Sequence, residues 1–272
     1  MRFPHVKPPL GIPIDPSNPL AKGLVGYWPM NEGTGNIVQD LSGNGNDGDI
    51  GINLAWGYGK FGSDIDFAGT DNDDDSDNVI DFPGITVIPG DFTLAHWQMV
   101  PPTAWMGFCT FGFAEEAGLQ TYIEKYYTQT AAGPTTHKWE VRNNWGAGIT
   151  LTSDRNCQRN VWEFTALTRR GNTVRHYVNG VEQSTTGALV GSIDVSHLHQ
   201  IGWAQNHKGV SYIYRGKLGP VYYYGRALTA SEIQKLNYDP FGIIQPTFSV
   251  WWYSGIGGEA PAAYGQVIMI SN

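Results

Sequence analysis

The sequence predicts an all-β protein built from many short antiparallel strands. Its 272 residues include 35 glycines and 16 prolines, which favour frequent tight turns. Aromatic residues make up 13% of the chain and charged residues only 15%, a balance that disfavours long solvated helices. Several segments alternate apolar and polar residues with a period of two, as half-buried strands do. These observations indicate one large all-β domain with extensions at its ends.

The strands follow one another through most of the chain. The first is expected at residues 24–28, where the run LVGYW is apolar throughout. Further strands are predicted at 55–58, 64–67, 79–82, 91–97, 108–113, 119–123, 138–142, 148–151, 161–167, 173–178, 181–183, 200–203, 212–214 and 216–224. Asn179-Gly180 predicts a two-residue hairpin turn. One helix is clear, at residues 229–236, where Thr229 and Glu232 have the spacing of a capping box.

Several motifs occur in a characteristic order. They read GYWPMNEGTG (26–35), DLSGNGNDG (40–48), DFTLAHW (91–97), GNTVRHYVNGV (171–181) and YGRALTASEI (224–233). Together they resemble laminin-G-like domains of the concanavalin A-like jelly-roll superfamily, over residues 24–236. The resemblance implies a jelly-roll β-sandwich of two antiparallel sheets with one short C-terminal helix. This superfamily includes lectins, glycanases, adhesion modules and virion proteins, so the resemblance implies a fold more than a function.

Three regions are predicted along the chain. Residues 1–23 hold six prolines and are expected to form an extended N-terminal arm. Residues 24–238 form the laminin-G-like jelly roll. Residues 239–272 form a C-terminal extension with two short apolar stretches, which must add to the sandwich or dock on a partner.

Composition excludes several classes of function. The formal net charge is −8 and basic residues do not cluster, so neither nucleic acid nor an anionic membrane is an expected partner. Residues 1–20 contain no apolar segment typical of a secretory signal, and no apolar stretch approaches the length of a membrane span. Cys109 and Cys157 make neither a disulfide framework nor a zinc-ligand spacing, and their pairing stays open.

Catalytic signatures are missing from the sequence. Jelly-roll glycanases resembling this chain place carboxylates on one strand as Glu-x-Asp-x-Glu or Glu-x-Asp-x-x-Glu, and no glutamate here has that spacing. A Gly-x-Ser-x-Gly motif and a cysteine with an evident histidine partner are also absent. The prediction is a non-enzymatic protein, with a glycoside hydrolase as the disfavoured alternative.

Two segments offer oxygen ligands for Ca²⁺. One is the opening loop with Asp40, and the other is the acidic loop with Asp71, Asp73, Asp75 and Asp77. The alternative for the acidic loop is a solvated segment of spread charges. Relatives often carry an acidic residue where this chain has Gly219-Pro220, which argues against a metal at the opening loop. Asp40 then acts as a turn residue that accepts hydrogen bonds from nearby amides.

Aromatic residues in or near predicted loops are candidates for glycan stacking, because flat rings match the apolar faces of sugars. These residues are Trp56, Tyr58, Trp105, Trp145 and Trp203. A second apolar set lies in the C-terminal extension and is predicted to dock on partners. It comprises Phe248, Trp251, Trp252, Tyr253, Ile268 and Ile270.

The arm, the jelly roll, the aromatic extension and the missing signal together predict a structural or surface-binding protein of a virus particle. Such a head-decoration, fibre or tail subunit is made in the host cytoplasm and reaches the outside after release. Its expected partners are other virion subunits or further copies of itself, with weak binding to a host-surface glycan. The alternative is an independent carbohydrate-binding lectin module.

Overall fold

The computed structural model describes residues 7–67, 78–85, 90–101, 106–116, 119–130, 133–142, 148–191, 199–207, 210–244, 249–250 and 269–270. Over these residues the chain forms β-strands, one α-helix and one 3₁₀ turn, which confirms the predicted all-β class. Among the described residues, no helix combines the length and the hydropathy needed to cross a membrane.

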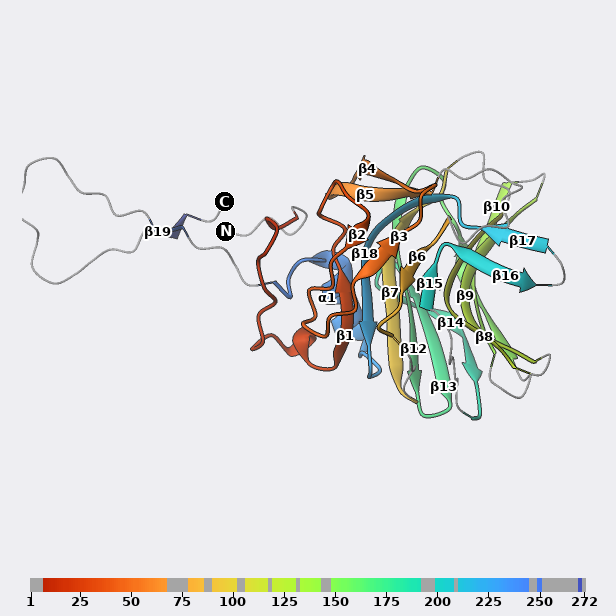
Figure 1. Ribbon diagram of the computed structural model, residues 1–272. Coiled ribbons are helices and arrows are strands. Elements are labelled where there is room, and N and C mark those ends of the chain that lie inside the picture. The colour runs from red at the N-terminus through yellow and green to blue at the C-terminus, as the bar shows by residue number, and fades with distance from the viewer. Residues whose placement is uncertain are drawn as a thin grey trace, which may run out of the picture.

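One layer of the sandwich is an eight-stranded antiparallel sheet (Figure 1). Its order is β14 (Val181–Ala188), β13 (Thr173–Val178), β12 (Trp162–Arg170), β7 (Phe92–Met99), β18 (Gly216–Tyr224), β5 (Gly62–Phe67) and β4 (Ala55–Gly59). The eighth strand, β1 (Leu24–Trp28), also pairs with β18. The opening and closing motifs of the family pattern are therefore neighbours in this sheet.

Two smaller sheets make the other layer. The first has the order β11 (Gly148–Asn156), β10 (Gly133–Arg142), β9 (Leu119–Thr130) and β8 (Met106–Glu116). The second has the order β15 (His199–Ile201), β6 (Ile80–Phe82), β3 (Gly48–Ile50) and β2 (Ile37–Val38). β16 (Trp203–His207) pairs with β17 (Val210–Ile213), and β19 (Ser249–Val250) pairs with β20 (Met269–Ile270). β2 and β3 lie within the glycine-rich stretch of residues 33–50, where the sequence predicts a loop and no strand.

Strand alternation gives the main sheet two different faces. Phe92 and Leu94 of β7 belong to the apolar core shared with Trp139 of the other layer. Ala95 and Trp97, on the opposite face of β7, belong to a second apolar cluster. We call these the inner face and the outer face. Since both faces of β7 are buried, the outer face needs a covering layer of its own.

The outer layer consists of α1 (Ala230–Tyr238), η1 (Pro19–Ala21) and residues 239–244. Leu20, Ile233 and Phe241 supply its apolar contacts to the sheet. The capping box predicted for the helix is confirmed, because Thr229 Oγ1 accepts from the Glu232 amide and the Glu232 carboxylate accepts from the Thr229 amide. The capping box fixes the start of α1. The buried residues of this helix, Ile233 and Leu236, pack against the outer face.

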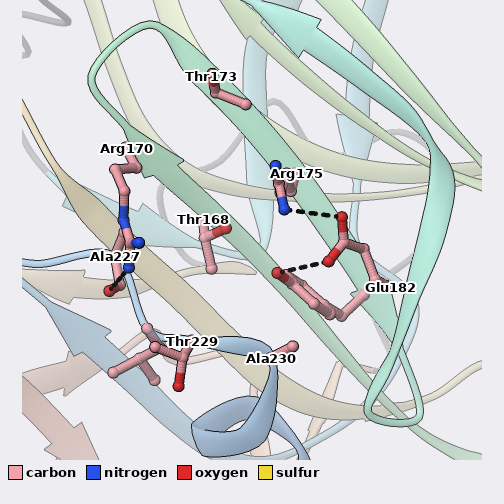
Figure 2. A pocket seen from close by; sticks show the side chains of 10 residues that line it. Thr168, Arg170, Thr173, Arg175, Glu182, Ala227, Thr229 and Ala230 are labelled. Carbon is pink, nitrogen blue, oxygen red and sulfur yellow. Dashed lines mark hydrogen bonds and ion pairs between the residues drawn. The ribbon is translucent and has the colours of Figure 1, made fainter.

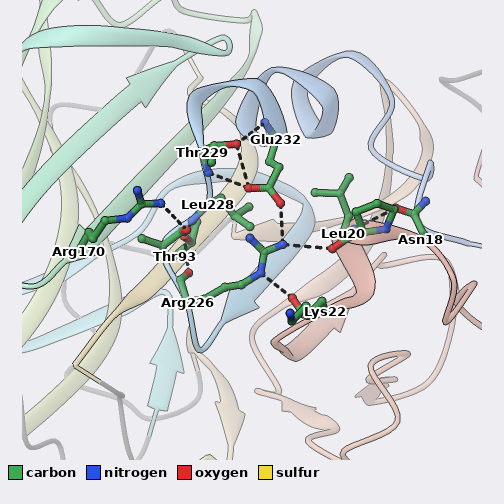
Figure 3. Close-up of polar contacts among 11 residues, drawn as sticks. Asn18, Leu20, Lys22, Thr93, Arg170, Arg226, Leu228, Thr229 and Glu232 are labelled. Atoms are coloured by element: carbon green, nitrogen blue, oxygen red, sulfur yellow. Dashed lines mark hydrogen bonds and ion pairs between the residues drawn. The ribbon is translucent and has the colours of Figure 1, made fainter.

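Arg226, in the turn between β18 and α1, connects these pieces (Figure 3). Its Nε donates to the Lys22 carbonyl oxygen at 2.7 Å, and its Nη2 donates to the Pro19 carbonyl oxygen at 3.2 Å. The same Nη2 lies 2.8 Å from Glu232 Oε1. One guanidinium therefore contacts both η1 and the first turn of α1. It can do so because its N–H donors point in several fixed directions.

The N-terminal arm is less extended than the sequence predicts. η1 forms because proline at the first helical position loses no hydrogen bond, and Asn18 Oδ1 accepts from the Leu20 amide at 2.9 Å. Asn18 also donates to the Gly242 carbonyl oxygen at 2.7 Å, which ties the arm to the segment after α1. Further upstream, Lys7 Nζ donates to the carbonyl oxygens of Met30 and Ser63. Burial lowers the pKa of Lys7 to about 7, against the opposing effect of nearby carboxylates.

Candidate functional site

The Asp40 carboxylate organises the opening loop. Oδ1 accepts from the amides of Tyr27 at 2.9 Å and Ser42 at 2.8 Å. Oδ2 accepts from Ser42 Oγ at 2.6 Å and from the Asn46 amide at 3.0 Å. Both oxygens thus face N–H and O–H donors, which is the turn-residue role expected as the alternative to calcium binding. The Asn46 carbonyl oxygen in turn accepts from Trp28 Nε1 at 2.7 Å, so the loop is joined to the core.

Several predicted site residues lie outside the described residues. They are the acidic-loop residues Asp71, Asp73, Asp75 and Asp77, the aromatic residues Trp105 and Trp145, and the docking residues Phe248, Trp251, Trp252, Tyr253 and Ile268. Trp203 begins β16 and Ile270 ends β20, with both side chains outside the described set. The roles assigned to these residues stay predictions.

Trp56 and Tyr58 lie on β4, the edge strand of the main sheet. Trp56 is half-buried against the inner core, and its Nε1 donates to the Gly35 carbonyl oxygen at 2.8 Å. Tyr58 is 82% exposed. Tyr58 is therefore the more accessible ring of the two, while Trp56 also fastens the opening loop.

A pocket of about 270 Å³ lies at the opposite end of the main sheet, on the outer face (Figure 2). β12, β13, β14 and the start of α1 supply its walls. The residues lining it are Thr168, Arg170, Thr173, Arg175, Tyr177, Glu182, Ala227, Leu228, Thr229 and Ala230. The outer layer covers the outer face only as far as the first turn of α1. The part of the outer face beyond that turn, over β12, β13 and β14, stays open.

The hairpin turn sets the geometry of the pocket. Asn179 and Gly180 have φ of 50° and 78°, as the predicted two-residue turn requires, and the turn pairs Tyr177 with Glu182. Thr173, Arg175 and Tyr177 alternate along β13 and so share the outer face. The two strands thereby bring a cation, a carboxylate and a phenol together.

Polar contacts hold these side chains in place. Arg175 Nη1 lies 3.2 Å from Glu182 Oε1, and Tyr177 Oη donates to Glu182 Oε2 at 3.4 Å. Burial, followed by the neighbouring Glu182 carboxylate, raises the pKa of Tyr177, so the phenol stays a hydrogen-bond donor at neutral pH. Arg170 Nη2 donates to the Ala227 carbonyl oxygen at 3.3 Å. Arg170, Arg175 and Glu182 are exposed residues.

Such a pocket can hold a ligand rich in hydroxyl groups. Arginine supplies several planar donors, the carboxylate supplies acceptors, and the threonine hydroxyls do both. Among the described residues that line the pocket, Glu182 is the one carboxylate. The pair of carboxylates that glycoside hydrolysis requires is therefore not formed by this lining.

This pocket was not predicted from the sequence, because the predicted glycan-binding residues were aromatic rings in or near loops. The available signal was the register of the Asn179-Gly180 hairpin, which fixes Glu182 opposite Tyr177. A buried group of His137, Cys157 and Glu163, which the fold brings together inside the sandwich, was not predicted from the sequence either. Those three residues come from different strands or loops, and no sequence spacing relates them.

A family model described as the concanavalin A-like lectin/glucanases superfamily matches residues 74–234. The chain belongs to this superfamily, and the resemblance drawn from its motifs is confirmed. No curated protein sequence matches the chain.

Solved structures with the same fold include toxin binding domains. The binding domain of Paraclostridial mosquitocidal protein 1 is 16% identical with a TM-score of 0.59, over 82% of this chain and 53% of that chain. The receptor binding domain of botulinum neurotoxin D is 10% identical with a TM-score of 0.61, over 86% and 56%. This chain thus spans about half the length of each.

A third similar structure matches over nearly its whole length. Domain 4 of AbnA, a GH43 extracellular arabinanase from Geobacillus stearothermophilus, was solved in complex with arabinotriose. It is 18% identical with a TM-score of 0.57, over 79% of this chain and 98% of that domain. At these identities the structures establish a shared fold, which is the fold of carbohydrate-binding and receptor-binding domains.

Proposed function

We propose that this protein is a non-enzymatic binding module that takes a saccharide in the pocket between β12, β13, β14 and α1. The observation that carries the proposal is the fixed set of Arg175, Tyr177 and Glu182 beside the exposed Arg170. These groups are held on strands rather than on loops, so they cost little ordering when a ligand binds. Saccharides present adjacent hydroxyl groups that match such paired donors and acceptors.

The structural comparisons support the ligand class by analogy. A whole domain of similar fold was solved with arabinotriose, and other similar domains bind receptors according to their descriptions. Fold alone does not determine function, so the proposal rests mainly on the chemistry of the pocket. The lone carboxylate in its lining supports binding without hydrolysis.

The test is binding of the full chain to a panel of glycans, with single variants. We expect Arg175→Ala and Glu182→Ala each to weaken binding of a responding glycan by about tenfold or more, because each removes a hydrogen-bonding charge. Tyr58→Ala, at the opposite edge of the sheet, is the matched control and is expected to leave binding unchanged. Isothermal titration calorimetry gives the dissociation constants.

Three results would contradict the proposal. The wild-type chain could bind no glycan, the pocket variants could bind as tightly as the wild type, or the purified protein could release sugar from a polysaccharide. Loss of binding in Tyr58→Ala alone would move the site to the β4 edge, where the sequence predicts aromatic stacking.

We propose further that the module is a subunit of a virus particle, fastened to other virion subunits or to copies of itself by its C-terminal extension. The supporting observation is that β19 and β20 pair with each other. A two-stranded pair this short has little stability of its own in water, so it needs packing against a further surface, which in this proposal is a neighbouring subunit. In the sequence, Trp251, Trp252 and Tyr253 of the predicted docking set lie between the two strands.

A chain that ends at Ile244 tests this second proposal. Ile243 and Ile244 pack in the outer cluster, so the shortened chain keeps its apolar contacts and is expected to fold. We expect it to lose co-sedimentation with particles, or self-association in analytical ultracentrifugation, while its thermal unfolding changes little. A shortened chain that still assembles would show that residues 245–272 do not fasten the subunit.

A further inference from the structure

His137, Cys157 and Glu163 meet inside the sandwich at a place independent of the saccharide pocket. One ligand-type atom from each residue lies within 4.8 Å of the other two, and all three residues are 0–1% exposed. His137 belongs to β10, Cys157 directly follows β11, and Glu163 lies on the inner face of β12. The group therefore joins the two layers of the sandwich.

His137 points inward by the regular alternation of β10, because His137, Trp139 and Val141 are buried while Lys138 and Glu140 are half-buried. The register of β10 shifts at this residue against both of its neighbours, between Thr136 and Lys138 on the β11 side and between Pro134 and His137 on the β9 side. Such bulges are frequent beside functional sites. His137 Nε2 lies 3.1 Å from Glu163 Oε2.

We propose that these three side chains form a buried zinc site. A neutral imidazole, a thiolate and a carboxylate are the ligand types that Zn²⁺ takes in proteins, and a thiolate and an imidazole do not suit Ca²⁺ or Mg²⁺. Zinc–ligand bonds of about 2.0–2.3 Å in a tetrahedron place the ligand atoms about 3.3–3.8 Å apart. The His137–Glu163 separation of 3.1 Å is close to that range, the three ligand atoms all lie within 4.8 Å of one another, and a water molecule would complete four-coordination.

Charge balance favours the same ion. Burying a carboxylate and a thiolate between two sheets is costly unless positive charge compensates them, and the half-exposed Arg155 beside Glu163 compensates only part of this charge. Zn²⁺ with one thiolate, one carboxylate and one neutral imidazole has a net charge of zero. The surroundings support the carboxylate as well, because the Gln158 amide donates to Glu163 Oε2 at 2.9 Å and Arg155 Nη2 lies 3.6 Å from Oε1. These contacts would orient Glu163 in the manner of outer-shell partners.

The test begins with the full chain purified without a polyhistidine tag and without chelator. Inductively coupled plasma mass spectrometry is expected to find about one zinc per chain. Adding zinc to the chelator-treated protein is expected to raise Tm by about 5 °C or more, since the folded state alone presents the assembled site. Co²⁺ in place of zinc is expected to give a thiolate charge-transfer band and the visible absorption of a tetrahedral ion.

Variants assign the ligands. Cys157→Ser is expected to remove the charge-transfer band, and Cys109→Ser, which changes the other cysteine of the chain, is expected to keep it. His137→Gln and Glu163→Gln are expected to weaken zinc binding by about tenfold or more. Should a variant fail to fold, labelling of wild-type Cys157 by a maleimide is expected to be slowed by zinc and restored by chelator. A wild-type chain that takes up no zinc, or a band that persists in Cys157→Ser, would overturn the proposal.

Discussion

Replacing Asp40 with alanine is expected to lower the free energy of unfolding by about 3–5 kcal/mol, a large part of the stability of an ordinary domain. The Asp40 carboxylate accepts four hydrogen bonds, from Tyr27, Ser42 and Asn46. Without it, these donors lose their acceptor and the carbonyl of Asn46 no longer lies fixed beside Trp28 Nε1. Thermal unfolding followed by circular dichroism should show Tm lower by roughly 10 °C.

Asp49→Ala is the matched control, because Asp49 lies on β3, directly after the motif that contains Asp40, and is exposed. It is expected to change stability by less than about 0.5 kcal/mol.

Calcium and chelator separate the two roles predicted for Asp40. In the turn role, neither reagent moves the Tm of the wild type. A wild type stabilised by calcium, together with an Asp40→Ala variant that does not respond, would instead place a metal at this loop.

Local sequence rules account for the frame of the fold. The Asn179-Gly180 turn, the Thr229–Glu232 capping box and the strand at residues 216–224 are all found where they were predicted. Each of these depends on a few adjacent residues whose conformational preferences agree with the final structure. The family motifs add the order of the strands, since β1 and β18 carry the opening and closing patterns and pair with each other.

The candidate sites depend on contacts that adjacent residues do not determine. Arg170 is exposed because the outer layer ends at the first turn of α1. The residues next to Arg170 in the sequence do not determine where that layer ends. His137 reaches Glu163 because β10 and β12 belong to different layers of the sandwich that face each other, an arrangement that no local pattern encodes. The arm shows the same limit, because η1 needs Arg226 and Gly242 from the far end of the chain. A local pattern predicts the strand but not what packs on it.

Tyr222→Ala is expected to lower the free energy of unfolding by about 4 kcal/mol, and Tyr222→Phe by only about 1 kcal/mol. Tyr222 lies on the outer face of β18, fully buried, with its ring 4.9 Å from that of Tyr27 at an interplanar angle of 13°. Its hydroxyl donates to the Pro240 carbonyl oxygen at 2.6 Å, and burial raises its pKa, so the hydroxyl stays protonated. Alanine leaves a cavity under residues 239–244.

The phenylalanine variant separates packing from hydrogen bonding. It keeps the ring, and the Pro240 carbonyl oxygen still accepts from Tyr27 Oη at 3.2 Å, so no buried acceptor loses its last donor. Urea denaturation gives both free energies, with a common m-value if unfolding stays two-state. Equal losses in the two variants would mean that the hydroxyl, not the ring, fastens the segment after α1. Because Asn18 bonds to Gly242 in that segment, Tyr222→Ala should also make the N-terminal arm more susceptible to limited proteolysis, and Tyr222→Phe should not.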